Sequence, residues 1–122
     1  MRLPWVTIAE FIAAEESTSV YYELTGTIGA TINTTYGNFD LTDETGTVYV
    51  YGLTKAFIAV GSTKNEKSYS SLGLVAGDNI TIRGYRGSYN GKVEVKGAFV
   101  VSHYTLLRYF AEHFCGSAPE DR

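Results

Sequence analysis

The sequence contains few of the residues that build disulfide scaffolds, metal sites or membrane spans. Its 122 residues include one cysteine, Cys115, two histidines and two prolines. A single cysteine excludes an intrachain disulfide, and no apolar run approaches the length of a transmembrane helix. The first residues also lack the long apolar core of a signal peptide. We therefore expect no membrane span and a chain that is soluble as given, which leaves open that it is the mature part of an exported protein.

An excess of basic residues is missing as well, since the net charge is −3. The charges are unevenly distributed: residues 1–54 hold one arginine against seven acids, whereas residues 55–108 hold eight bases against three acids. A polyanionic ligand would therefore meet positive charge only on the second half of the chain, where a local basic patch remains open.

Composition and pattern favour one all-β domain. Apolar residues make up 44% of the chain and charged residues 19%, and ten tyrosines and thirteen glycines accompany them. Alternating apolar and polar residues predict five strands, at about 20–32, 38–43, 47–53, 79–86 and 92–101. Gly26 and Gly29 predict a bend in the first strand. The connection 53–76 is left without an assigned structure.

The hairpin formed by the second and third strands carries the most informative pattern. Phe39, Leu41, Val48 and Val50 recur at every second position and are expected to point into the core. Asp40, Thr42, Tyr49 and Tyr51 then share the outer face. Residues 43–46 form the turn, for which we expect Gly46 to supply a positive φ angle. Asn90 and Gly91 predict a second tight hairpin turn.

Two helices are expected to flank the strands. Thr7, with Glu10 three residues later, predicts the capping box of a short N-terminal helix. Residues 104–114 have helical spacing and few charges, and residues 115–122 are expected to form a loose tail. A helix this apolar beyond a complete barrel is a natural surface for homo-oligomers. The residues predicted for that interface are Leu106, Leu107, Phe110 and Phe114.

The order of elements predicts a five-stranded Greek-key β-barrel. At this point four segments resemble a known group: GTI at 26–28, YGNFDLTDETGTVYVYG at 36–52, LGLVAGD at 72–78 and VVSH at 100–103. They resemble the OB-fold, nucleic-acid-binding-like domains of exported or lipoprotein-associated proteins of gut Bacteroidetes. The resemblance covers residues 6–103 of a single domain, 1–122. The helix at 104–114 and the free cysteine lie outside it, which leaves open an engineered version of such a domain.

The resemblance implies a binding face, because OB-folds generally bind ligands on the outer face of strands two and three and on the flanking loops. Carried onto this chain, it implies these binding residues: Tyr36, Asp40, Thr42, Tyr49, Tyr51, Lys55, Arg83, Arg86, Tyr89, Asn90, Lys92 and Lys96.

The leading hypothesis is weak, sequence-tolerant binding of single-stranded nucleic acid, in which tyrosines stack on bases and lysines and arginines contact phosphates. Asp40, Asp43 and Glu44 on or beside the same face oppose a polyanion. The alternative is a protein- or saccharide-binding or oligomerisation module that uses the same rings. We expect no enzyme, no cofactor and no metal, because His103, His113 and Cys115 have neither the spacing of zinc ligands nor the partners of a nucleophilic site.

Overall fold

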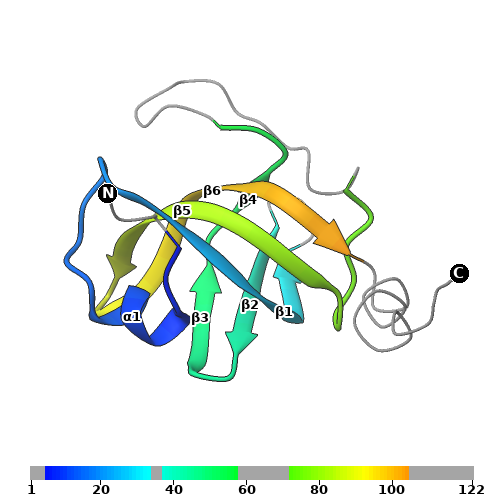
Figure 1. Cartoon of the computed structure of the whole chain (residues 1–122), viewed down its shortest axis with the longest axis horizontal. Helices are drawn as coiled ribbons and strands as arrows, with labels where there is room; N and C mark the ends of the chain where they lie inside the picture. Colours follow the sequence, from blue (N-terminus) through cyan, green and yellow to red (C-terminus); the bar gives the residue numbers. More distant parts are fainter. Residues whose placement is uncertain (1–4, 34–36, 58–71, 105–122) are drawn as a thin grey trace, which may run out of the picture.

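A computed structural model describes residues 5–33, 37–57 and 72–104, which form one helix and six strands (Figure 1). In chain order these are α1 (Ile8–Ala13), β1 (Tyr21–Asn33), β2 (Asn38–Asp43), β3 (Gly46–Val50), β4 (Leu53–Thr54), β5 (Asn79–Tyr89) and β6 (Lys92–Tyr104).

The strands form a closed barrel. Antiparallel pairs join β3 to β2, β2 to β1, β1 to β5 and β5 to β6, and a parallel pairing of β3 with β6 closes the ring. The short β4 follows β3 after Gly52, whose φ angle is 85°, and it also pairs in parallel with β6. Five strands therefore close the barrel, with β4 as a broken continuation of the third. The expected five-stranded, OB-like barrel is confirmed.

Strand β1 curls so that it pairs on both sides. Residues from Tyr21 to Thr27 pair with β5, whereas residues from Thr27 to Asn33 pair with β2 through two register shifts. Gly26 lies at the crossing, where a β-carbon would lie 2.6 Å from the carbonyl oxygen of Thr42. The predicted glycine bend is therefore a position at which two strands approach too closely for any side chain.

The core fills the barrel and is covered at one end by α1, which lies beside the lower end of β3 in Figure 1. Ile8 and Phe11 of this helix are fully buried against the barrel residues. The predicted capping box is present: the backbone N–H of Glu10 donates to Thr7 Oγ1, and the N–H of Thr7 donates to Glu10 Oε1. Among the barrel residues, the largest fully buried side chains include Phe39, Leu24, Ile28, Leu41, Leu53, Ile80 and Ile82.

The β2–β3 turn is closed by an aspartate rather than by a glycine. Gly46 is not among the residues with positive φ, so that expectation was wrong. Instead, Asp43 Oδ1 accepts hydrogen bonds from the N–H and hydroxyl of Thr45 and from the N–H of Gly46. Asp43 Oδ2 also accepts from the N–H of Ile8, which ties the turn to the start of α1. The predicted β5–β6 turn is confirmed, since Asn90 and Gly91 have φ angles of 53° and 80°.

The predicted C-terminal helix and its interface residues, Leu106, Leu107, Phe110 and Phe114, lie outside the described residues. Only Tyr104 is described, and it ends β6 rather than beginning a helix. In the described part of the chain, no helix has the length and apolar character needed to cross a membrane.

Candidate ligand-binding face

The seam where β3 meets β6 brings the central residues of the predicted face together with a second hairpin. Across the outer surface, Asp40 of β2 lies opposite Tyr49 of β3, and Tyr49 lies opposite Glu94 of β6. Glu94 in turn lies opposite Gly87 of β5. The face therefore extends beyond the β2–β3 hairpin and runs over the β5–β6 hairpin.

Three tyrosines and two lysines gather on this surface. Lys92 Nζ lies 4.4 Å from the centre of the Tyr49 ring, and Lys96 Nζ lies 6.0 Å from the centre of the Tyr51 ring. Tyr89 lies opposite Lys92 at the tip of the β5–β6 hairpin. Tyr51 and Tyr89 are 57% and 65% exposed, so their rings are available to a ligand. We call Tyr49, Tyr51, Tyr89, Lys92, Glu94 and Lys96 the tyrosine face.

A cavity of about 320 Å³ lies within the tyrosine face, lined by Tyr51, Tyr89, Glu94 and Lys96. Its volume falls at the lower end of the range of small-molecule sites. Glu94 is only 5% exposed, although it belongs to the outer surface of the barrel. The cavity thus combines exposed aromatic rings, one ammonium group and a carboxylate beneath them.

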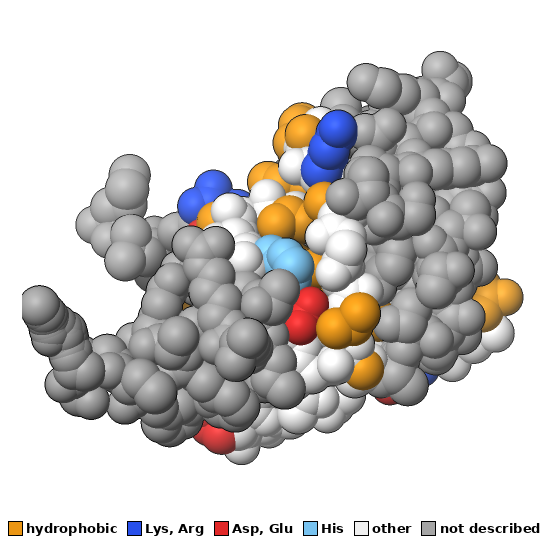
Figure 2. Space-filling view, turned by 90° about the vertical axis from the view of Figure 1, so that its right-hand side faces the viewer, with side chains coloured by type: hydrophobic (Ala, Val, Ile, Leu, Met, Phe, Trp, Pro, Cys, Tyr) orange, Lys and Arg blue, Asp and Glu red, His pale blue; other side chains and the backbone are white. Residues whose placement is uncertain are grey.

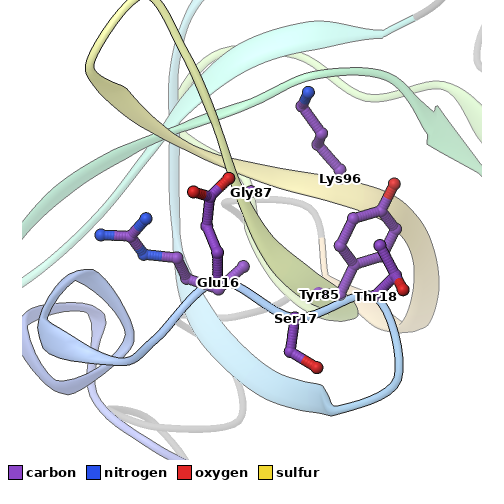
Figure 3. Close-up of a pocket in the computed structure, with 7 residues that line it drawn as sticks. Glu16, Ser17, Thr18, Tyr85, Gly87 and Lys96 are labelled. Atoms are coloured by element: carbon purple, nitrogen blue, oxygen red, sulfur yellow. The ribbon is translucent and has the colours of Figure 1, made fainter.

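A second hollow of about 300 Å³ adjoins the first, because Lys96 lines both (Figure 3). Its other walls are Tyr85 and Gly87 of β5, the Arg86 side chain, and Glu16, Ser17 and Thr18 of the segment between α1 and β1. In Figure 3 the Lys96 side chain extends above the Tyr85 ring, and Thr18 lies beside that ring. Both hollows lie against Lys96 on the β5–β6 hairpin, and together we call them the path.

Neighbouring rings hold Tyr85 in this position. The Tyr21 ring packs against it at an angle of 68°, with the ring centres 5.7 Å apart. Burial of the Tyr21 hydroxyl, with a smaller contribution from nearby Tyr85, raises the pKa of Tyr21. Phe99 and Phe57 extend the same cluster. Because the cluster fixes its ring, Tyr85 offers a preformed aromatic wall at the far end of the path.

The predicted site residues are only partly brought together. Arg83 lies on the outer surface of β5 toward β1 and forms a salt bridge of 3.0 Å with Glu23. Arg86 instead donates from its guanidinium to the carbonyl of Ile12 at the end of α1. Neither arginine has its charged group among the three tyrosines.

The remaining predicted residues lie around the rim. Thr42 bonds through its hydroxyl to that of Thr47, 2.9 Å away, near the β2–β3 turn. Asn90 occupies the β5–β6 turn beside Tyr89, and Lys55 is exposed just after β4. Tyr36 lies outside the described residues.

Sequence reasoning missed Glu94, Tyr85 and the loop at 16–18. Glu94 lies between Lys92 and Lys96 in the alternating sequence of β6. That pattern predicts an ordinary solvent-exposed carboxylate. Its placement follows only from the parallel β3–β6 pairing. The alternation of Tyr85, Gly87 and Tyr89 was the available signal, because it puts both tyrosines on one face of β5.

A histidine and a buried aspartate pair at the other end of the barrel. His103 Nε2 lies 3.0 Å from Oδ2 of Asp78, which is 1% exposed. The Asp78 carboxylate also accepts from the N–H of Val75. Figure 2 shows the described histidine among hydrophobic and acidic side chains. Across residues 5–33, 37–57 and 72–104, no three His, Cys, Asp or Glu side chains group to hold a metal ion.

Fold and site together define an OB-like barrel with an aromatic, mixed-charge outer face. Neither the family models nor the curated proteins contain a match to this chain. Among solved structures, the hypothetical protein ygiW from E. coli is 16% identical and aligns with a TM-score of 0.47, over 82% of this chain and 87% of that one. At that similarity the comparison carries no argument about function, and the barrel is defined by its own strand pairings.

Proposed function

We propose that the protein is a non-catalytic binding module that holds single-stranded nucleic acid weakly on the tyrosine face. The proposal draws on the resemblance of residues 36–52 to OB-fold domains of exported Bacteroidetes proteins, and on the face itself. It assigns no catalytic residue, cofactor or metal to the chain. The rings serve as stacking platforms, and the lysines serve as phosphate contacts.

The observation that carries the proposal is the gathering of three tyrosines and two lysines on one outer surface. Stacking of a base on an aromatic ring contributes about 1–3 kcal/mol and tolerates any base. Lys92 and Lys96 approach the rings of Tyr49 and Tyr51, so a stacked base would have an ammonium group close to its phosphate. This combination is typical of surfaces that bind single strands.

The charge of the tyrosine face sets the expected affinity for a single strand. Lys92 and Lys96 share the outer surface with Glu94 and Asp40, so two positive charges are balanced by two negative ones. With two phosphate contacts on a single strand, log K falls against log salt with a slope of about −1.4. A tenfold increase in salt should therefore weaken binding about 25-fold. Such binding is weak and depends mainly on stacking.

Fluorescence anisotropy with a labelled single strand of about twelve nucleotides, within the site sizes of OB-folds, tests the proposal. Saturable binding with a salt slope near −1.4 supports it. Absence of binding at about 100 µM protein and low salt, the weak end of non-specific binding, contradicts it. A double-stranded probe of the same sequence is the control, since its bases cannot stack on the rings.

A saccharide is the second candidate, and the balanced charge favours it. Carboxylates of Asp40 and Glu94 accept hydrogen bonds from sugar hydroxyls, and tyrosine rings pack against the apolar faces of sugars. A neutral oligosaccharide would bind with no dependence on salt, because it displaces no counterions. Calorimetry with neutral oligosaccharides at two salt concentrations separates this candidate from the first.

A further inference from the structure

We infer that Glu94 makes the tyrosine face select guanine over thymine in a bound single strand. The inference rests on the proposed function and adds a base preference to it. It follows from three features of Glu94: its low exposure, the two acceptor oxygens of its carboxylate and its place in the cavity.

Glu94 as a whole residue is only 5% exposed, yet it belongs to the outer surface of the barrel rather than to the core. In the strand pairing, Glu94 lies opposite Tyr49 of β3 and opposite Gly87 of β5. Gly87 has no side chain to cover Glu94. The aliphatic stem of Lys96 crosses Gly87, where an added β-carbon would lie 2.7 Å from Lys96 Cδ. Glu94 is therefore enclosed by neighbouring side chains while it lines the cavity.

In residues 5–33, 37–57 and 72–104 the enclosed side-chain atoms that lack a bonding partner are Tyr21 Oη, Asn38 Oδ1 and Arg86 Nε, and the Glu94 oxygens are not among them. Glu94 lines the cavity together with Tyr51, Tyr89 and Lys96, where a ligand can reach its carboxylate. Lys92 and Lys96, two positions away on either side, balance the charge of Glu94 without bonding to it. The acceptor capacity of Glu94 is thus available to a ligand in the cavity.

A carboxylate has two oxygens that accept two parallel N–H bonds. Guanine presents such a pair on its Watson–Crick edge, from N1–H and the 2-amino group. Thymine presents a single N–H between two carbonyl oxygens, which a carboxylate repels. Adenine and cytosine present one amino group beside an acceptor nitrogen, so they rank between guanine and thymine.

The stacking rings orient the base for this contact. Tyr51 and Tyr89 are the exposed walls of the cavity, and Glu94 lies in its lining with them. A base stacked on either ring turns its edge, rather than its face, toward groups in the adjoining wall. Lys96 in the same cavity is then placed for the phosphate and not for the base edge.

Three labelled strands of about twelve nucleotides test the preference by anisotropy: all-thymine, alternating thymine and guanine, and alternating thymine and hypoxanthine. Hypoxanthine keeps N1–H and lacks the 2-amino group. The guanine strand should bind about tenfold more tightly than the thymine strand, with hypoxanthine between them. In Glu94→Gln the guanine advantage should fall below about twofold. Glu44→Gln, in the exposed β2–β3 turn, should leave it unchanged.

Each outcome distinguishes the guanine preference from the proposed binding of single strands. Equal binding of the three strands overturns the guanine preference and leaves the proposed function standing. The same follows if Glu94→Gln keeps the full guanine advantage. Absence of binding by every strand overturns both. The three strands are compared on the unaltered protein, so this part of the test does not depend on whether a variant folds.

Discussion

Lys92 Nζ lies 4.4 Å from the centre of the Tyr49 ring, and this contact joins the start of β6 to the end of β3 across the barrel seam. A cation above a tyrosine ring at an exposed site is worth about 0.5–1 kcal/mol. The contact holds an ammonium group over one face of a ring that the proposed function uses for stacking. Charge and ring are therefore positioned together.

Replacing this lysine should change the salt dependence of binding more than it changes stacking. Lys92→Met keeps most of the aliphatic stem and removes the charge, so the salt slope should fall from about −1.4 to about −0.7. Anisotropy titrations over a salt series measure the slope. Arg83→Gln removes one charge from a salt bridge on another sector and should leave the slope as it is. An unchanged slope in Lys92→Met would exclude this lysine as a phosphate contact.

Tyr85 should matter for long strands and not for short ones. It lines the second hollow, which shares Lys96 with the first. Tyr85→Ala should therefore weaken binding of a strand of about twelve nucleotides by about fivefold or more, and leave one of about four nucleotides unaffected. Tyr85→Phe, which keeps the ring, is the matched control. Equal losses for both lengths would show that the two hollows do not form one path.

The two glycines of β1 should respond differently to alanine. In Gly26→Ala the new β-carbon would lie 2.6 Å from a backbone oxygen, so β1 and β2 must separate, at a cost of about 2 kcal/mol or more. In Gly29→Ala the nearest atom is 3.4 Å away, which is close to an ordinary contact. Chemical denaturation measures the free energy of unfolding of both variants. Equal destabilisation by the two substitutions would contradict the close approach at Gly26.

Asp43 should contribute stability that disappears in acid. Partial burial raises the pKa of Asp43, but hydrogen bonds from the Thr45 hydroxyl and from the backbone N–H groups of Ile8, Thr45 and Gly46 outweigh it, and the pKa is lowered. A lowered folded-state pKa stabilises the protein above the unfolded value, about 3.9, and this stability is lost as pH falls through the folded value.

Asp43→Asn should therefore cost about 1 kcal/mol at neutral pH, and the cost should shrink below about pH 4. Denaturation midpoints from neutral pH to pH 3 give the profile. Glu44→Gln, one residue along the same turn, supplies the control for a general loss of negative charge. A cost that stays constant across this pH range would contradict the role of the ionised carboxylate.

The barrel could be predicted from sequence because strand alternation and turn chemistry are local signals. Phe39, Leu41, Val48 and Val50 alternate with polar residues, and all four are buried as their pattern indicates. Asn90 and Gly91 specify their turn through the positive φ angles that these residues tolerate. The turn at 43–46 was mistaken because the Asp43 side chain closes it by accepting from Thr45 and Gly46, so that no positive φ angle is needed at Gly46.

The site was less predictable because it depends on which strands meet. Tyr49 and Tyr51 were identified from one hairpin, whereas Glu94 reaches them only through the β3–β6 pairing. Arg86 was expected at the ligand, but α1 offers its guanidinium the carbonyl of Ile12 at a helix end. Long-range pairing and helix capping of this kind leave no local pattern in the sequence.

The central claim is that the rings of the tyrosine face bind single strands by stacking. Its most direct test is the affinity of Tyr49→Ala plus Tyr51→Ala for a labelled strand of about twelve nucleotides, against Tyr49→Phe plus Tyr51→Phe as the variant that keeps both rings. At about 1–3 kcal/mol per ring, the alanine pair should lose about 30-fold or more in affinity, and the phenylalanine pair should stay near the unaltered protein. Equal affinity of the alanine pair and the unaltered protein would contradict the claim.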